Sequence, residues 1–204
     1  PADYAWDDTI ESIIMHPDPA GGYLSIVDIY DTSDVTFEGF VIQELNAEAN
    51  LNSSLVRVRA ETQEISNIIV RNNVIGPNTN VVSQDGTHGR MGLYLVNNPY
   101  SDQFGIVDST FSGNKIFGCE GNGNNVFIWS SYSNPTYGAP GPASMAGTVI
   151  EDNEIYGSHR SGIETAGGFS DLTISNNSIY GNFKLPGDAP DLKYGNGILM
   201  IRGS

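Results

Sequence analysis

The chain has 204 residues, which is enough for one elongated domain with a sizeable core. Its net charge of −15 argues against nucleic acid and anionic membrane surfaces as partners, while 39% hydrophobic residues separate it from a disordered acidic tail. The single cysteine, Cys119, excludes an internal disulfide and the zinc motifs built on paired cysteines. No apolar run approaches the ~20 residues that a membrane helix needs.

We expect residues 1–22 to be irregular or to form the entry into a first coil, and residues 1–204 to form a single domain. The sequence looks like a mature or clipped piece of a longer chain, because it stops just after a strong strand pattern at residues 198–201. Open ends of stacked-strand folds expose unpaired backbone and apolar core. We therefore expect a continuation, a partner fragment or another copy to cover that end.

Two kinds of short segment alternate along the chain. The first kind has an apolar residue, Asn three positions later, an aliphatic residue two further on and Gly two beyond that, and it occurs at residues 69–76, 111–118, 150–157 and 174–181. Residues 35–42 look like an earlier copy without the Asn. The second kind is a plain strand pattern, found at residues 55–58, 92–96, 125–129, 162–165 and 197–201, with an earlier copy at 22–26.

Such a repeat favours a solenoid of short strands. One coil cannot bury its inward aliphatic side chains, but stacked coils enclose them in a continuous core. Like residues then fall above one another, and the asparagines form a hydrogen-bonded ladder at a bend, where Asn tolerates left-handed backbone. We predict that ladder from Asn72, Asn114, Asn153 and Asn177. Phe117, Tyr156 and Tyr180 also share one repeat position and should pack against neighbouring coils.

The phrases at residues 34–40 and 171–182 resemble the repeat of the right-handed parallel β-helix proteins in the pectate-lyase-like superfamily. The resemblance implies an all-β fold, a right-handed parallel β-helix of about five to six coils without substantial helix. A leucine-rich repeat fits less well, because nothing reads as a helix in each repeat, and an antiparallel sandwich is the other competitor. The superfamily holds lyases, hydrolases, epimerases, phage tailspikes and noncatalytic surface proteins, so the fold leaves the activity open.

The resemblance also implies that the plain strands form the first sheet of each coil and that substrates lie along its outer face. The period-two alternation of a strand points Arg57, Tyr94, Phe127, Glu164 and Leu199 outward. Two positions further on come Arg59, Val96, Trp129, Ala166 and Ile201. His88, Arg90, His159 and Arg160 lie just before two of these strands.

This gathering of cations and aromatic rings suggests an acidic polysaccharide as ligand, because Arg binds carboxylates and aromatic rings cover sugar faces. The candidate substrate-binding residues are Arg57, Arg59, Tyr94, Phe127 and Trp129. The candidate catalytic residues are His88, Arg90, His159, Arg160 and Glu164. A lyase would use His88, His159 or an Arg as base, Tyr94 as proton donor and Arg57, Arg90 or Arg160 to neutralise the uronate. A hydrolase would pair Glu164 with Asp152, Glu151 or Glu120.

Plainer readings stand beside these. The arginines can be solvated strand residues, the histidines loop residues with local hydrogen bonds, and the module a noncatalytic surface or adhesin scaffold. The acidic groups Asp7–Asp8, Glu61 with Glu64, Asp31 with Asp34, and Asp188 with Asp191 are candidates for Ca²⁺, although none forms an EF-hand loop and solvated surface is the simpler reading. No cofactor is otherwise indicated, and we expect an extracellular or cell-surface location.

Overall fold

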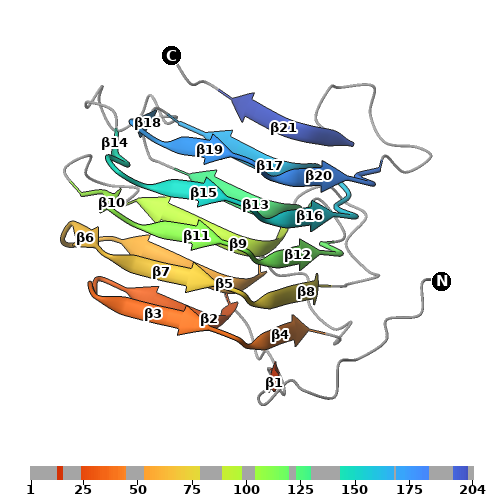
Figure 1. The fold of residues 1–204 in the computed structure, drawn as a ribbon, viewed down its shortest axis with the longest axis horizontal. Helices are drawn as coiled ribbons and strands as arrows, with labels where there is room; N and C mark the ends of the chain where they lie inside the picture. Colours follow the sequence, from red (N-terminus) through yellow and green to blue (C-terminus); the bar gives the residue numbers. More distant parts are fainter. Residues whose placement is uncertain are drawn as a thin grey trace.

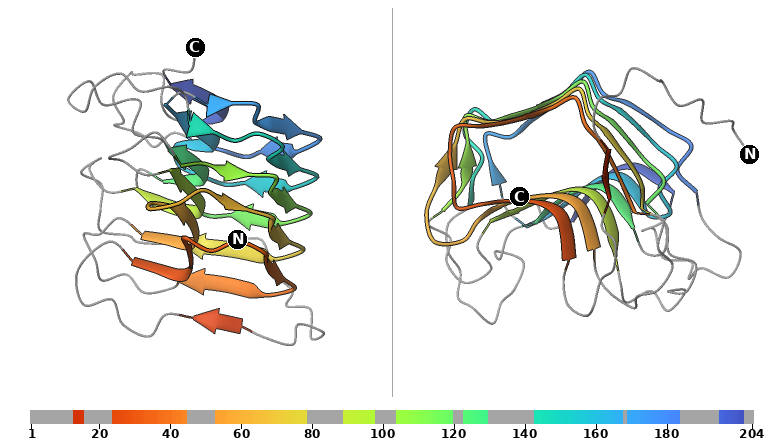
Figure 2. Two further views of the ribbon diagram at one scale, coloured as in Figure 1. Left: turned by 90° about the vertical axis from the view of Figure 1, so that its left-hand side faces the viewer. Right: turned by 90° about the horizontal axis from the view of Figure 1, so that it is seen from below.

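The computed structural model describes residues 13–15, 24–44, 53–78, 89–97, 104–119, 123–129, 143–167, 169–183 and 195–201. Within these ranges all strand pairs are parallel and no helix occurs. Coil upon coil, the chain winds in a right-handed sense from β1 and β2 at the bottom of Figure 1 to β21 at the top, and Figure 2 shows the stack from its side and from below. The predicted all-β, right-handed parallel β-helix is confirmed.

Three stacked sheets form the wall of the solenoid. The first sheet contains β2 (Leu24–Tyr30), β5 (Ser53–Ala60), β9 (Arg90–Asn97), β13 (Asn124–Trp129), β17 (Ser161–Ala166) and β21 (Asn196–Ile201). The second contains β3 (Val35–Glu38), β7 (Ile68–Arg71), β11 (Thr110–Ser112), β15 (Val149–Glu151) and β19 (Thr173–Ser175). The third contains β1 (Ile13–Met15), β4 (Val41–Glu44), β8 (Val74–Asn78), β12 (Lys115–Phe117), β16 (Glu154–Tyr156) and β20 (Ser178–Tyr180).

Two short strand pairs complete the wall where the chain passes from the first sheet to the second: β6 (Ile65–Ser66) with β10 (Ile106–Val107), and β14 (Ala143–Ser144) with β18 (Phe169–Ser170). The described strands make five complete coils, from β2 onward, and β21 opens a sixth. Within the entry segment, β1 pairs in parallel with β4 at the N-terminal end of the third sheet.

The core consists of vertical files of aliphatic side chains. In the third sheet Ile42, Ile75, Ile116 and Ile155 lie in register and are fully buried. In the first sheet the predicted inward file of Val56, Leu93, Val126 and Ile163 is likewise fully buried. Each such side chain contributes roughly 1.5–3 kcal/mol by leaving water, a gain that exists only when coils are stacked.

Gly92 and Gly162 are required by close packing between the first and third sheets. A Cβ on Gly92 would lie 2.6 Å from Cγ2 of Ile116, and one on Gly162 would overlap Cγ2 of Ile179 and lie 2.8 Å from the Gly197 carbonyl oxygen. The small residue at the start of each plain strand pattern therefore lets two walls of the solenoid touch.

An internal asparagine ladder ties the coils together at the bend between the second and third sheets. Its rungs are Asn73, Asn114, Asn153 and Asn177. Each Oδ1 accepts hydrogen bonds from the backbone N–H and the Nδ2 of the rung below, as in Asn73 N and Nδ2 to Asn114 Oδ1, both at 3.1 Å. The same pair of bonds recurs from Asn114 to Asn153 and from Asn153 to Asn177, at 2.9 to 3.1 Å.

The prediction of Asn72 as the first rung is wrong, since that rung is Asn73. Val70 is the residue in register with Phe111, so the repeat in this coil begins one position later than the sequence alignment placed it. Gly76 misled the alignment: Pro77, and not Gly76, lies against Gly118, the glycine of the next coil.

The left-handed backbone also lies one position earlier than predicted. Asn72, Asp152 and Asn176 have φ of 55 to 56°, and Gly113 has φ of 62°, whereas no rung of the ladder has positive φ. The residue before the rung therefore makes the bend, and the rung itself is free to point inward and bond along the axis.

The shared aromatic position behaves as the sequence predicts. Phe117, Tyr156 and Tyr180 stack on the outer face of the third sheet, with centroids 5.2 and 5.1 Å apart and interplanar angles of 5 and 6°. The Tyr180 hydroxyl donates to Glu154, and this hydrogen bond raises the pKa of Tyr180 to about 12.

Candidate functional site

The candidate site is the outer face of the first sheet, where the strand register brings three rows of residues into line. The middle row follows the prediction and runs Asp28, Arg57, Tyr94, Phe127, Glu164, Leu199. The last row runs Tyr30, Arg59, Val96, Trp129, Ala166, Ile201. A first row, not foreseen, runs Ser25, Ser54, Met91, Asn124, Ser161, Asn196.

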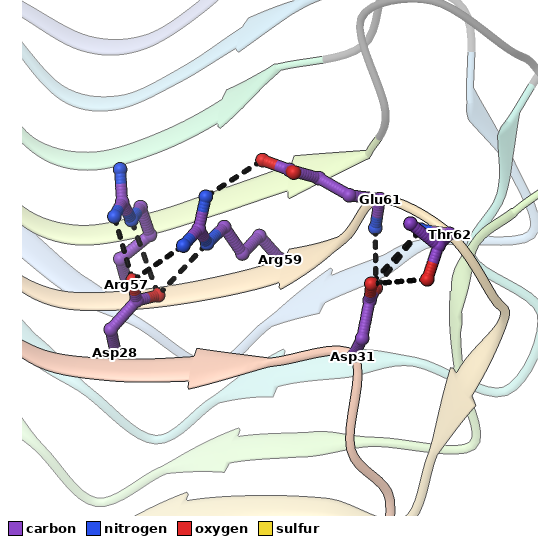
Figure 3. Close-up of polar contacts among 6 residues, drawn as sticks. All are labelled: Asp28, Asp31, Arg57, Arg59, Glu61 and Thr62. Atoms are coloured by element: carbon purple, nitrogen blue, oxygen red, sulfur yellow. Dashed lines mark hydrogen bonds and ion pairs between the residues drawn. The ribbon is translucent and has the colours of Figure 1, made fainter.

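At the N-terminal end of this face Arg57 and Arg59 both bind the carboxylate of Asp28. Arg57 Nη2 lies 2.7 Å and Arg59 Nη2 3.0 Å from Asp28 Oδ2, and both Nε atoms donate to Oδ1 at 3.2 Å (Figure 3). Arg59 also pairs with Glu61 at 2.8 Å and covers the Tyr30 ring, 4.0 Å from its centroid. Burial lowers the pKa of Arg59, but the charges of Asp28 and Glu61 outweigh burial and raise that pKa above its ordinary value.

Asp31 binds the next coil beside this cluster. Its carboxylate accepts hydrogen bonds from the N–H groups of Glu61 and Thr62, at 2.6 and 3.1 Å, and from the Thr62 hydroxyl at 2.6 Å (Figure 3). Burial raises the pKa of Asp31, but the hydrogen bonds from Thr62 and from the two backbone groups outweigh it, and the pKa lies below its ordinary value. Asp31 therefore has a structural role in the described coils.

The centre of the face is apolar. Met91, Tyr94 and Val96 form a buried cluster separate from the main core, and Phe127 and Trp129 pack against it. The Tyr94 and Phe127 rings stack with centroids 5.4 Å apart and planes inclined by 14°. The predicted aromatic residues therefore lie together, with Phe127 and Trp129 more accessible than Tyr94.

Towards the C-terminal end lies a buried polar cluster. Arg160 Nη2 is 2.6 Å from Glu164 Oε1, and Glu164 is only 1% exposed. Asn124 and Ser161 lie beside this pair in the row of Met91, which faces outward with Tyr94 and Val96. Asn124 Oδ1, Ser161 Oγ and Arg160 Nε are buried and have no hydrogen-bond partner among the described residues.

Arg90 lies apart from Arg160 and Glu164. It stands two residues before Gly92 as Arg160 does before Gly162, but its guanidinium is buried, 3.0 Å from Ser53 Oγ and 3.9 Å from Glu44 Oε2. Arg90 therefore holds the early coils together, whereas Arg160 belongs to the outer face.

The two predicted histidines have different outcomes. His159 is buried, its N–H donates to the Cys119 carbonyl at 3.1 Å, and its ring stacks on Phe183 with centroids 5.7 Å apart. It is next to Arg160 in the chain but packs on the side of Phe183. His88 lies outside the described residues, as does Glu120. The structure thus brings together Arg160 and Glu164 of the five candidate catalytic residues.

Sequence reasoning missed Asp28, Asn124 and Ser161. Asp28 follows from the same alternation, extended along the earlier strand that begins at Leu24. Asn124 and Ser161 had no such signal, because the two residues that follow each of them on its strand both point inward at a kink, and the simple period of two fails there.

The acidic groups considered for Ca²⁺ are partly accounted for. Among the described residues no three His, Cys, Asp or Glu side chains are arranged to hold a metal ion. Asp31 bonds to Glu61 and Thr62, and Asp34 accepts from Asn67 Nδ2 at 2.8 Å. The groups Asp7–Asp8 and Asp188 with Asp191 lie outside the described residues.

Comparison with protein-family models and with curated proteins finds no match. A search of solved structures finds the enzymatically active domain of tailspike protein 2 from bacteriophage CBA120, at 12% identity and a TM-score of 0.32. The match covers 95% of this chain and 39% of that one, so the chain spans well under half of the tailspike domain's length. The fold assignment rests on the strand pairing, and this likeness adds nothing about activity. No helix in the described ranges is long and apolar enough to cross a membrane.

Proposed function

We propose that the chain is a secreted or cell-surface carbohydrate-active module that binds an acidic polysaccharide along the outer face of the first sheet and cleaves it at Arg160 and Glu164. The observation that carries the proposal is the buried polar cluster. Asn124 Oδ1, Ser161 Oγ and Arg160 Nε face outward without a hydrogen-bond partner in the described structure. Buried polar atoms are normally bonded, and the hydroxyl groups of a sugar offer both donors and acceptors for them.

The aromatic centre supports the same reading. Phe127 is the next residue of the middle row after Tyr94, and Glu164 follows Phe127 on the adjacent strand. Adjacent strands are about 4.8 Å apart, so a sugar ring lying on Phe127 or Trp129 is within reach of Asn124, Ser161 and Glu164. Burial of an aromatic ring against the apolar face of a sugar is a substantial contact.

The acidic nature of the polymer is supported by Arg57 and Arg59. Their shared grip on Asp28 shows that this end of the face is built to hold a carboxylate between two guanidinium groups. A uronate would replace or extend that arrangement. In cleavage, Arg160 would neutralise the sugar carboxylate and Glu164 would transfer the proton, as a base in a lyase or with a second carboxylate in a hydrolase.

Binding tests the first half of the proposal. Ser161→Ala removes a hydroxyl with no partner in the described structure, so it should preserve the melting temperature and weaken binding to a uronate polymer about tenfold, near 1.4 kcal/mol. Trp129→Ala should weaken binding by a similar factor. Ser175→Ala, on the second sheet, is the matched control. Affinity electrophoresis against a panel of uronate and neutral polymers provides the measurement, and equal mobility of all four proteins on every polymer contradicts the proposal.

Turnover tests the second half. Glu164→Gln should abolish product formation while the control Glu38→Gln, an exposed carboxylate on the second sheet, leaves it unchanged. A rise in ultraviolet absorbance marks a lyase, and new reducing ends without that rise mark a hydrolase. Binding without turnover reduces the function to a binding module.

A noncatalytic surface or adhesin scaffold is the second candidate. It is favoured by the ion pairs of Arg57 and Arg59 with Asp28 and Glu61 and by the burial of Tyr94, since these contacts join one coil to the next without any ligand. This function predicts that the folded protein binds no polymer of the panel.

A further inference from the structure

The C-terminal end of the solenoid exposes residues that belong to core files. Ile198 is in register with Ile163, and Met200 with Thr165, both of which are buried in the preceding coil. Yet Ile198 is 50% and Met200 70% exposed. In the described structure β19, β20 and β21 are each the last strand of their sheet, so their outer edges carry unpaired backbone groups.

The asparagine ladder ends with a rung that still has hydrogens to donate. The lower rungs each donate from the backbone N–H and from Nδ2 to the Oδ1 of the next rung. Asn177 instead turns Nδ2 to the carbonyl of Ser175 in its own coil, at 2.9 Å, and its N–H has no acceptor among the described residues. The last rung lacks the oxygen that a further Asn would supply.

The aromatic file on the outer face of the third sheet also stops with one ring face open. Phe117 and Tyr156 are covered by the next ring along the axis, whereas Tyr180 stacks on Tyr156 alone in the described coils and is 48% exposed. Three independent files, aliphatic, amide and aromatic, thus end open at the same place.

We infer that this end is an interaction surface for a further parallel β-helix coil that carries the same repeat, with Asn placed above Asn177, an aromatic ring above Tyr180 and aliphatic side chains above Ile198 and Met200. The partner is specified by chemistry: only a coil with an amide oxygen at the rung position accepts the N–H and Nδ2 of Asn177. The burial of Ile198 and Met200 would supply most of the free energy, and the rung would fix the register.

A second copy of this chain stacked head to tail does not fit that description. At the N-terminal end the rung position is taken by Phe40, whose N–H donates to Asn73 Oδ1 at 3.0 Å and whose ring stacks on Phe37. Phe40 offers Asn177 no amide oxygen. In addition, β1 already lies against β4 at that end of the third sheet.

An extended protein tests the inference. After Ile201, a copy of residues 167–183 completes the sixth coil that β21 begins and places a copied Asn above Asn177. The extension should raise the melting temperature by more than about 4 °C and lower the fluorescence of bound anilinonaphthalene sulfonate at least twofold. The matched control carries Ala in place of the copied Asn and should lose at least half of the thermal gain.

A second variant keeps the test decisive if the extension folds poorly. Ile198→Asp should shift the melting temperature of the 204-residue protein by less than about 2 °C, because the side chain is half exposed, but should cancel the gain of the extended protein. The inference is overturned if the extension leaves the melting temperature unchanged or lowers it, if the Asn and Ala extensions stabilise equally, or if Ile198→Asp costs the same in both backgrounds.

Discussion

Asn114 shows how much one buried amide does in this fold. It accepts two hydrogen bonds from Asn73, donates two to Asn153 and donates a third to the carbonyl of Val70. Its side chain is almost completely buried, so removing it leaves donors on the neighbouring rung without an acceptor and without water. The ladder is therefore a structural requirement and not a by-product of composition.

We predict that Asn114→Ala lowers the free energy of unfolding by about 3 kcal/mol, because several buried hydrogen bonds are lost together. Asn72→Gly is the control: it keeps the left-handed backbone and removes only an exposed hydrogen bond to Glu38, so it should change stability by no more than about 0.5 kcal/mol. Urea denaturation measures both. A larger effect of the Asn72 variant would show that the ladder has been placed on the wrong asparagine.

Asp31 gives the molecule a pH dependence at acid pH. Because its folded pKa lies below the unfolded value of about 3.9, the stability it contributes is present above that value and is lost as pH falls through the folded pKa. Asp31→Asn should therefore cost about 1 kcal/mol at pH 7 and progressively less below pH ~4. Urea midpoints at a series of pH values measure the difference.

Thr62→Val serves as the companion variant, since it removes one of the donors to Asp31 and keeps the carboxylate. It should produce a smaller loss at pH 7 than Asp31→Asn. A difference between wild type and Asp31→Asn that is constant from pH 2 to pH 7 would contradict the role assigned to the charge.

At the level of elements, the closest contact is between the glycine that precedes each inward residue of the first sheet and the aliphatic file of the third. Gly162→Ala should destabilise by about 2 kcal/mol, because its Cβ would overlap Ile179 Cγ2 and approach the Gly197 carbonyl. Gly197→Ala, at the equivalent position one coil later, is the control.

At Gly197 an added Cβ would lie 3.9 Å from Ile179 Cγ2, an ordinary contact, and its φ is not in the left-handed region. The change should be within about 0.5 kcal/mol of wild type. Thermal melts of the two variants measure the difference. Equal destabilisation would mean that backbone freedom, and not the approach of the two sheets, explains these glycines.

The element scale also shows where sequence reasoning succeeds and fails. The repeat predicts which segments form which sheet, because stacking forces like residues into register, and the inward and outward rows of the first sheet follow from a period of two. It fails at Asn72 and Asn73, where two asparagines are adjacent and a glycine out of line gives the wrong alignment. It also fails at Asn124 and Ser161, since the strand kink that turns them outward depends on the contact between sheets.

On the scale of the whole molecule, the scarce cations are used to join coils. Every Lys and Arg in the described ranges takes part in an ion pair: Arg57, Arg59, Arg71, Arg90, Lys115 and Arg160. Three of these pairs, Asp28 with Arg57, Glu38 with Arg71 and Lys115 with Glu154, connect one coil to the next. The enrichment of arginine on the first sheet could be read from the sequence, but its engagement with Asp28 could not, because the partner lies 29 residues away.

The asparagine ladder also makes the solenoid electrically directional. At every rung the hydrogens of the amide and the backbone N–H point towards the C-terminal end, and the oxygen faces the N-terminal end. Aligned groups of this kind polarise one another, so each added rung strengthens the bonds below it. The two ends of the stack thus differ in sign as well as in shape, and such a thread can be lengthened with mutual reinforcement only by a coil that enters in the same polarity.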